Sequence, residues 1–246
     1  MLVAIFSDVH ANREAFEACL AHARLLRAER IVLLGDVMGY GADPVWAVET
    51  VMGLAERGAV VLKGNHDAAV DGSSDDMNGA ARAAILWTRG QLGAAHHDFL
   101  ARLPLIHEEG EILYVHANGY APASWGYVTG PESAQFSMER SGHWLTLCGH
   151  VHVPALYHLD LAGRIGAFNP TCRVDIPLLA QRQWLAVVGS VGQPRDGHPA
   201  AAYALLDTDK RTLRYLRVPY DHERAARKIL AAGLPERLAD RLAVGR

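Results

Sequence analysis

The chain has 246 residues, half of them hydrophobic, and carries a formal net charge of −3. This length and composition allow one large α/β domain with a sizeable core and exclude a disordered protein. The slightly acidic balance argues against an extended nucleic-acid partner, whose binding surface would show a clustered excess of Lys and Arg.

Cysteine usage and the N-terminus indicate the compartment. Cys19, Cys148 and Cys172 are an odd number without CxxC spacing, which favours reduced thiols in the cytosol. The first residues lack a basic leader and reach Asp8 too early for a secretory segment, and no later apolar run is long enough to span a membrane. We therefore expect a cytoplasmic protein without a membrane partner.

Short apolar runs alternate with longer helical patterns as far as His152, which favours a layered α/β fold. The runs predict strands at Leu2–Phe6, Ile31–Leu34, Val60–Leu62, Ile112–Val115 and Leu145–Cys148. The helical patterns between them predict helices at Arg13–Glu29, Pro44–Arg57, Gly79–Leu92 and His96–Leu103. Asn12 and Asp43 are suitable N-caps for the first two helices, and residues 39–41 and 71–76 are expected to form surface loops near the strand ends.

Beyond His152 the chain changes to shorter strand-like segments with turns at residues 162–164 and 207–210. They predict a second sheet built from Ala155–Leu159, Trp184–Val188, Ala202–Leu206 and Leu213–Val218. The helical pattern from His222 to Leu242 is interrupted by Gly-Leu-Pro, which predicts two short helices. Since no linker divides the chain, we expect a single domain over residues 1–246 with a helical tail from about residue 222.

Polar residues follow all five apolar runs of the first part. The runs end in "SDVH", "GD", "KGNHD", "HAN" and "GHVH". One such ending is typical of a tight turn, but open α/β sheets place ligand sites at the carboxyl ends of their strands, so five endings can converge on one crevice. The candidate side chains are Asp8, His10, Asp36, Asn65, His66, His116, His150 and His152.

These residue types favour metal chemistry. Residues two apart in an extended segment point to the same side, which pairs Asp8 with His10 and His150 with His152. Mixed imidazole and carboxylate ligands suit first-row transition metals, whereas magnesium and calcium prefer more oxygen. The set is too large for one ion, and a carboxylate that bridges two ions roughly 3.5–4 Å apart would use it.

The five endings also occur in a recognisable order. Read as "DVH", "GD", "GNHD", "VH" and "GHVH", they resemble the calcineurin-like metallophosphoesterase superfamily. The stretches "GDVMGYGADP", "WTRGQL", "GSVGQPRDG" and "YALLD" resemble its compact bacterial and archaeal, phosphodiesterase-like branch. The resemblance covers essentially the whole chain and implies a layered α/β/β/α sandwich of two mixed sheets flanked by helices.

The resemblance implies seven metal ligands for two divalent ions of manganese, iron, zinc or nickel. The first ion would be held by Asp8, His10 and His152, and the second by Asn65, His116 and His150. The carboxylate of Asp36 would bridge the two ions. By the same resemblance, His66 faces the substrate as a general acid or as a donor to the phosphoryl oxygens. Asp67 is expected to hold the loop.

The implied activity is hydrolysis of a small phosphate ester by direct attack of a metal-bound hydroxide. Two ions lower the pKa of a shared water, orient it for in-line attack on phosphorus and neutralise charge on the phosphoryl oxygens. Protonation of the leaving group by His66 would contribute typically about 10²–10⁴-fold, because imidazole titrates near neutral pH.

The choice between phosphate esters depends on a missing arginine. Superfamily branches that hydrolyse phosphoprotein monoesters or dinucleoside tetraphosphates carry Asp-Arg-Gly soon after the GD block, whereas this chain has no arginine between that block and Arg57. A dianionic monoester benefits from a third cation, while two ions satisfy the single charge of a diester. We therefore favour a phosphodiester; for a monoester, Arg13, Arg89 or Arg195 would have to supply the cation.

Four alternatives stay open: a phosphomonoesterase, a dinucleoside polyphosphate hydrolase, a nuclease, and a non-catalytic metal-bearing interaction scaffold such as the superfamily's relative in the retromer coat. The complete ligand set argues against the scaffold, and the acidic balance argues against the nuclease. The other histidines lie outside any metal-spaced motif and are expected at surface or structural positions: His22, His96, His97, His107, His143, His158, His198 and His222.

Overall fold

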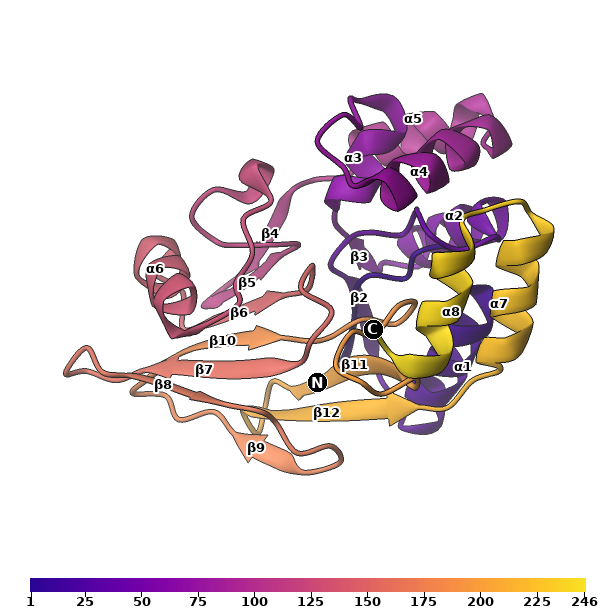
Figure 1. Cartoon of the computed structure of the whole chain (residues 1–246). Coiled ribbons are helices and arrows are strands. Elements are labelled where there is room, and N and C mark those ends of the chain that lie inside the picture. Colours follow the sequence, from indigo (N-terminus) through magenta and orange to yellow (C-terminus); the bar gives the residue numbers. More distant parts are fainter.

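The computed structural model describes residues 1–246 and contains two six-stranded mixed sheets flanked by helices (Figure 1). The first sheet has the order β3-β2-β1-β11-β12-β9, with bounds Val60–Val61, Arg30–Leu33, Leu2–Phe6, Ala201–Asp207, Thr212–Val218 and Asp175–Pro177. The second has the order β4-β5-β6-β10-β7-β8, with bounds Ile106–Glu109, Ile112–Val115, Leu145–Cys148, Gln183–Val187, Ala155–Leu159 and Ile165–Phe168. The α/β sandwich expected from the sequence is therefore confirmed.

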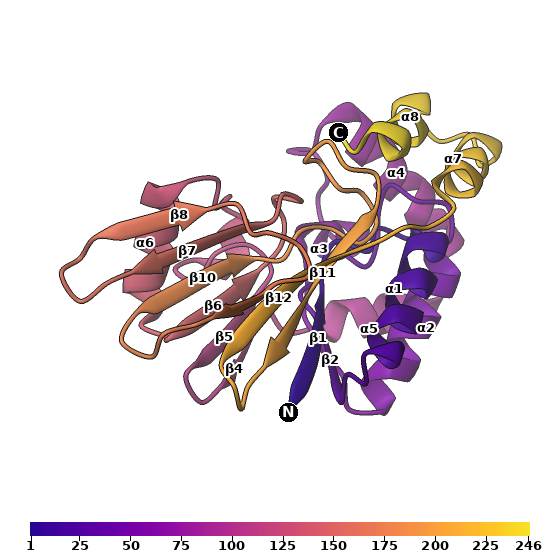
Figure 2. The same cartoon turned by 90° about the horizontal axis from the view of Figure 1, so that it is seen from below.

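Helices cover the outer faces of both sheets. Figure 2 shows the first sheet between the second sheet on one side and helices α1 and α2 on the other. Helix α6 packs on the outer face of the second sheet. The helices are α1 (Arg13–Leu25), α2 (Pro44–Glu56), α3 (Asn65–Asp71), α4 (Gly79–Gln91), α5 (Ala94–Arg102), η1 (Pro122–Ser124), α6 (Pro131–Ser141), α7 (His222–Ala231) and α8 (Glu236–Val244).

The period of a strand explains why β1 is continuously apolar. Val3 and Ile5 belong to the core between the sheets, whereas Ala4 and Phe6 belong to the core under α1 and α2. Successive side chains point to opposite faces, so a strand covered on both faces needs apolar residues at every position. This burial fixes the strand whose carboxyl end carries the first polar residues of the site.

The later strands do not form a sheet of their own, so this part of the sequence-based prediction is wrong. Strand β11 pairs antiparallel with β1, and β12 continues the first sheet. Strands β7 and β10 join the second sheet, where β10 lies parallel to β6. These pairings join segments far apart in the chain, and the hydrophobic pattern of each segment alone does not encode them.

The observed caps and loops agree with the sequence-based predictions at some positions and differ at others. Asn12 caps α1, because its side chain accepts a hydrogen bond from the Ala15 N–H, whereas Asp43 makes no capping bond and instead pairs with Lys228 of α7. Residues 39–41 are buried rather than a surface loop, because Tyr40 packs against α4, α7 and α8. The two short C-terminal helices are confirmed. No helix is long and apolar enough to cross a membrane.

Parallel strands from both sheets end at one edge of the sandwich. Strands β1, β2 and β3 are parallel neighbours in the first sheet, and β5, β6 and β10 are parallel neighbours in the second. The segments that follow these strands carry the polar residues singled out in the sequence. The fold thus brings residues 8–10, 36, 65–67, 116 and 150–152 to one place.

Candidate metal centre

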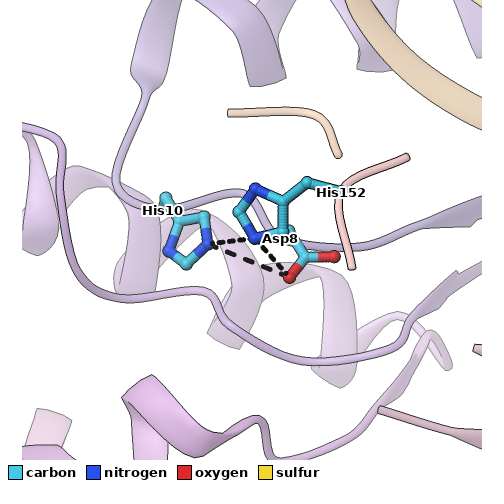
Figure 3. A group of neighbouring side chains, drawn as sticks. All are labelled: Asp8, His10 and His152. Carbon is cyan, nitrogen blue, oxygen red and sulfur yellow. Dashed lines mark hydrogen bonds and ion pairs between the residues drawn. The ribbon is translucent and has the colours of Figure 1, made fainter. Parts of the chain in front are cut away.

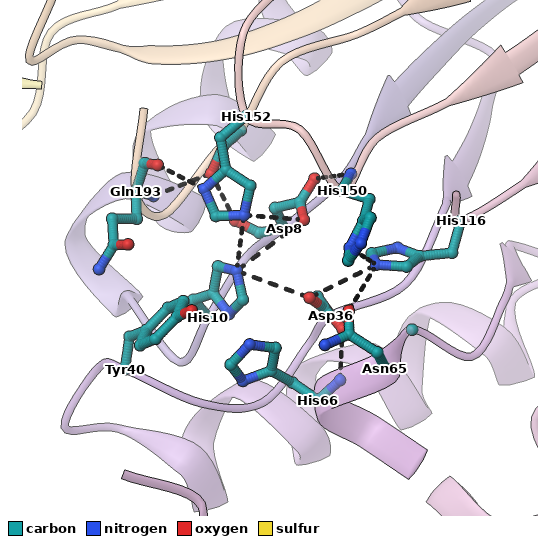
Figure 4. Close-up of polar contacts among 12 residues, drawn as sticks. Asp8, His10, Asp36, Tyr40, Asn65, His66, His116, His150, His152 and Gln193 are labelled. Atoms are coloured by element: carbon teal, nitrogen blue, oxygen red, sulfur yellow. Dashed lines mark hydrogen bonds and ion pairs between the residues drawn. The ribbon is translucent and has the colours of Figure 1, made fainter. Parts of the chain in front are cut away.

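All eight polar residues singled out from the strand ends converge at this edge (Figure 4). Seven of them are at most 5% exposed. The eighth, Asn65, is half-buried on the first turn of α3, beside His66. Seven of the eight form two clusters, here called the first cluster, Asp8, His10 and His152, and the second cluster, Asp36, Asn65, His116 and His150, and His66 lies beside them.

The first cluster consists of three acceptors that face one another (Figure 3). The Nε2 atoms of His10 and His152 lie 3.1 Å apart. Asp8 Oδ1 lies 3.1 Å from His152 Nε2 and 3.8 Å from His10 Nε2, and it receives no hydrogen bond. Buried polar atoms normally have a partner, so the site requires a cation or a proton among these three atoms.

The backbone identifies which ring nitrogens carry hydrogen. His10 Nδ1 lies 2.9 Å from the Met38 carbonyl oxygen, and His152 Nδ1 lies 2.6 Å from that of Gln193. A carbonyl oxygen only accepts, so both Nδ1 atoms donate and both Nε2 atoms present lone pairs when the rings are neutral. This is the arrangement by which backbone carbonyls orient metal-binding histidines.

The second cluster is centred on His116 Nε2. This atom lies 3.1 Å from His150 Nδ1, 3.2 Å from Asn65 Oδ1 and 3.4 Å from Asp36 Oδ2. His116 Nδ1 faces the Leu34 carbonyl oxygen at 3.1 Å, which fixes this ring in the same way. The cluster offers two imidazoles, an amide oxygen and a carboxylate, which suit a divalent transition metal.

Asp36 connects the two clusters. Its Oδ2 lies 3.4 Å from His116 Nε2 and 3.7 Å from His10 Nε2, while its Oδ1 accepts the His66 backbone N–H at 2.8 Å. A Cβ atom at Gly64 would collide with this carboxylate, so a glycine is required at this position, the N-cap of α3. The position of Asp36 suits a carboxylate shared by two ions.

The residues do not converge through extended backbone, as the sequence-based argument assumed. Asp8, His10, Asp36, His150 and His152 all have φ between 51° and 65°, in the left-handed region. Non-glycine residues seldom adopt this conformation, and it concentrates at functional sites. The tight turns send His150 to the second cluster and His152 to the first, so these two histidines do not act as a same-side pair.

The bare clusters differ in protonation. Burial above all pushes the pKa of His10 well below its ordinary value. Burial also lowers the pKa of His116, but the adjacent Asp36 carboxylate outweighs burial and raises that pKa to about 9. Burial alone would raise the pKa of Asp36, yet His116 and other nearby histidines hold it well below its usual range. The second cluster therefore holds a proton between Asp36 and His116 at neutral pH.

His66 lies beside the first cluster rather than in the second. Its ring centroid is 4.8 Å from that of His10 and 4.6 Å from that of Tyr40, and its Nδ1 is buried without a partner. Together with Asp36 and His10, His66 forms a third group of potential ligands, whose ligand atoms lie within 4.8 Å of one another. Burial lowers its pKa to about 4, so the ring is neutral at neutral pH.

Asp67 occupies the position expected for a residue that holds the loop. Its carboxylate accepts backbone N–H groups from Met38 and Gly64, both at 3.0 Å. These bonds tie the segment after β2 to the segment after β3 and bring Asp36 next to His66. Burial raises the pKa of this carboxyl group to about 7.

Three further residues border the centre without having been assigned a role from the sequence. The Tyr40 ring lies 4.5 Å from the His10 ring, and Trp125 and Tyr127 line a cleft next to His150. Tyr40 stands in the "GDVMGYGADP" stretch, so its motif was a usable signal. Trp125 and Tyr127 follow His116 by nine and eleven residues in a loop, and no spacing rule marks them.

The arginines named as possible phosphate contacts occupy different environments. Arg13 pairs with Glu17 and stacks on Trp46, and Arg89 donates to three backbone carbonyl oxygens at the end of α3. Arg195 donates to the Tyr40 hydroxyl at 3.2 Å and to Gln193 Oε1 at 3.1 Å, with no carboxylate among these partners. Arg195 is thus the arginine of the three that the fold brings beside the metal centre.

The remaining histidines lie apart from the centre. None of the eight belongs to a group of His, Cys, Asp and Glu side chains close enough to share an ion. His22 bonds the Tyr203 hydroxyl, His97 pairs with Asp71, and His143 pairs with Glu108. The fold therefore selects five of the chain's 13 histidines for the centre.

Comparison with known proteins agrees with this geometry. A model of the calcineurin-like phosphoesterase superfamily domain matches residues 1–211. An uncharacterised protein of Methanocaldococcus jannaschii is 34% identical over 251 residues, covering 100% of this chain and 98% of that protein.

Solved structures share the whole architecture. A metallophosphoesterase from Sphaerobacter thermophilus is 35% identical and superposes with a TM-score of 0.88, covering 100% of this chain and 99% of that one. A hypothetical protein from Pyrococcus horikoshii, at 20% identity, shares the fold with a TM-score of 0.78 over 100% of this chain and 98% of its own.

Proposed function

The chain belongs to the calcineurin-like phosphoesterase superfamily and is a metal-dependent phosphoester hydrolase, and on that premise we propose that it hydrolyses a small phosphodiester at a dinuclear metal centre. The observation that carries this proposal is the pair of buried clusters joined by Asp36. Each cluster holds nitrogen and oxygen acceptors 3.1–3.8 Å apart. Two cations would satisfy both sets.

The ligands divide between the ions according to the clusters. Asp8, His10 and His152 would hold the first ion, and Asn65, His116 and His150 would hold the second, with Asp36 contributing to both. When bound, two such ions activate a water for in-line attack on phosphorus and offset the charge of the phosphoryl oxygens. The carbonyl oxygens of Met38, Gln193 and Leu34 accept from Nδ1 of His10, His152 and His116, respectively. Each neutral ring therefore presents its Nε2 lone pair for metal binding.

His66 is the group of this chain assigned to the substrate. Its position beside His10 and Tyr40 puts it at the rim of the first cluster, with one ring nitrogen free of partners. Because burial leaves the ring neutral, its ready role is to donate an N–H to a phosphoryl oxygen. The negative charge of a bound phosphate raises the pKa of a nearby imidazole and allows the same ring to protonate the leaving group.

The absence of an arginine among the ligand motifs supports a diester, since two ions offset its single charge. Arg195 favours a second candidate, a phosphomonoesterase, because its guanidinium group next to Tyr40 could contact a dianionic phosphate. The two functions are separated by kcat/KM for bis(p-nitrophenyl) phosphate and for p-nitrophenyl phosphate with manganese present.

The proposal predicts that the diester is preferred in this comparison. A preference of about tenfold for the monoester, near 1.4 kcal/mol in transition-state stabilisation, would replace the phosphodiesterase by the phosphatase. In that case, Arg195→Ala would be expected to lower activity on the monoester more than activity on the diester, which identifies the source of the third cation.

A further inference from the structure

A cleft with a volume of about 470 Å³ opens beside the second cluster. Asn65 and His150 of that cluster form part of its wall, and the rest comes from the loop after β5 and from the segment at the end of α3. Ligand pockets commonly have volumes of about 300–1,000 Å³. The cleft therefore has room for a small organic group directly next to the metal centre.

Two aromatic side chains form the wall of the cleft nearest the second cluster. The Tyr127 ring stacks on the His150 ring at a centroid distance of 4.1 Å, with 23° between the planes, and Tyr127 remains 55% exposed. Trp125 meets His116 edge to face at 5.9 Å. Both rings thus contact candidate ligands and also line the cleft, where they can stack with a planar group.

The loop that carries these rings is held in place. Trp125 has φ of 54°, a left-handed conformation that a bulky residue rarely adopts. Asn118, fully buried, accepts the Ala121 N–H at 2.8 Å and donates to the Gly126 carbonyl oxygen at 3.1 Å. A Cβ at Gly126 would lie 2.8 Å from the Tyr120 hydroxyl oxygen, so a larger residue there would displace the Tyr120 side chain.

The charge of the lining indicates what the cleft does not bind. No Lys or Arg lines it, and its one carboxylate comes from Asp76. Its other polar side chains include the hydroxyls of Ser73 and Ser124, and Ala69 and Met77 contribute apolar surface. This lining disfavours a second phosphate or a carboxylate and suits an uncharged ring whose attached hydroxyl or amine groups can meet the polar atoms.

The position of His66 indicates which part of a diester faces the cleft. His66 groups with His10 and Tyr40 and does not line the cleft, whose nearest site residues are Asn65 and His150. A leaving group that contacts His66 would therefore lie on the side of the first cluster. The cleft is on the other side, toward the substituent that stays bonded to phosphorus.

We propose that the cleft binds an uncharged planar ring, carried by the alcohol that stays bonded to phosphorus, through stacking on Tyr127 and Trp125. The inference rests on the proposed function and narrows the substrate to diesters with one nucleoside or other aromatic substituent. Water attacks phosphorus, the bond to the other alcohol breaks, that alcohol leaves with a proton, and the ring departs as a phosphate monoester.

The test compares two diesters with the same leaving group on manganese-reconstituted protein. Thymidine 5′-(p-nitrophenyl phosphate) and ethyl p-nitrophenyl phosphate both release p-nitrophenolate and differ in the retained group. The wild-type chain should favour the nucleoside ester in kcat/KM by about tenfold, a factor within the range that base stacking on an aromatic side chain contributes. Tyr127→Ala and Trp125→Ala should each reduce this preference severalfold, whereas Tyr127→Phe should keep it.

Tyr120→Ala is the matched control, because Tyr120 belongs to the same loop but does not line the cleft. Its preference for the nucleoside ester should equal that of the wild type. Metal content is measured for every variant, since Tyr127 contacts His150. An unchanged preference in both Tyr127→Ala and Trp125→Ala, at normal metal content, would overturn the assignment of the cleft while leaving the phosphodiesterase in place.

A separate readout covers the case in which the wild type hydrolyses neither ester, which would contradict the proposed function. Saturation-transfer NMR with thymidine reports on the cleft without catalysis. Transfer to the base protons in the wild type and its loss in Tyr127→Ala would support the cleft. The absence of transfer in the wild type would overturn it.

Discussion

The first and second clusters of the metal centre differ in their access to solvent and in their protons. Asp8, His10 and His152 are each at most 2% exposed and do not line the cleft, so the first cluster is called the sealed cluster below. In the second cluster, Asn65 and His150 line the cleft. The sealed cluster is suited to hold an ion permanently, and the open cluster is suited to exchange its ion.

The two clusters also differ in the protonation of their histidines. In the first cluster, the Nε2 atoms of His10 and His152 face each other, and burial keeps the pKa of His10 well below its ordinary value. In the second cluster, Asp36 raises the pKa of His116 to about 9. An ion therefore enters the first cluster without displacing a proton from His10, but it must displace one from His116 at neutral pH.

The largest expected effect comes from the residue that joins the clusters. Asp36→Asn removes the shared charge from both and should lower kcat/KM by more than the roughly 10–100-fold typical of a residue that only orients a ligand. Steady-state assays with metal analysis check this, and Asp240→Asn on the exposed side of α8 is the control. An Asp36→Asn protein with full activity would show that the two clusters work independently.

The next effect separates substrate contact from metal binding. His66→Ala should keep near-normal metal content in both clusters while kcat falls on the order of 100-fold. The loss should shrink with a good leaving group such as p-nitrophenolate if His66 protonates the leaving group. Equal losses for good and poor leaving groups would assign His66 to the phosphoryl oxygens instead. Loss of one ion from His66→Ala would make it a ligand.

The proton difference predicts unequal pH dependence of metal binding. Proton and metal compete for His116 Nε2, so between pH 6.5 and 8.5 the affinity for the second ion should rise about tenfold per pH unit, and it should level off above about pH 9. The first ion should show a much smaller slope over this range. Chelator competition with manganese at three pH values measures both, and identical slopes would remove the distinction between the clusters.

The smallest expected effect concerns the helix caps near the two clusters. Asn78 caps α4 near the open cluster and is exposed, so Asn78→Ala should cost about 1 kcal/mol of unfolding free energy. Asn12 caps α1 and also donates to the Gly192 carbonyl oxygen at 2.8 Å, close to the sealed cluster. Asn12→Ala should therefore cost about 2–3 kcal/mol. Urea unfolding of the metal-free variants measures both losses of unfolding free energy. Equal losses for Asn78→Ala and Asn12→Ala would contradict a tighter coupling of α1 to the sealed cluster.

Sequence patterns predict the elements around the centre because each depends on local periodicity. Leu2–Phe6, Ile112–Val115 and Leu145–Cys148 are strands with the predicted bounds. The exchange of later strands between the sheets depends on pairing between distant segments, such as Leu2 with Asp207, which local periodicity does not contain.

The candidate residues could be read from the sequence because each lies directly after a strand. Their geometry could not, because the strand period does not apply to turns in which Asp8 and His150 adopt left-handed backbone. Trp125 and Tyr127 were missed for another reason. They stand in a loop whose path is set by Asn118, and the loop's contact with the second cluster appears only in three dimensions.

A manganese titration of metal-free protein tests most directly whether the chain holds a dinuclear centre with one sealed and one open cluster. Bound metal is measured by mass spectrometry at each step, together with hydrolysis of bis(p-nitrophenyl) phosphate. We predict that the chain binds two ions in sequence and that activity rises mainly with the second. Full activity with one ion bound, or activity that persists in excess chelator, would contradict the account.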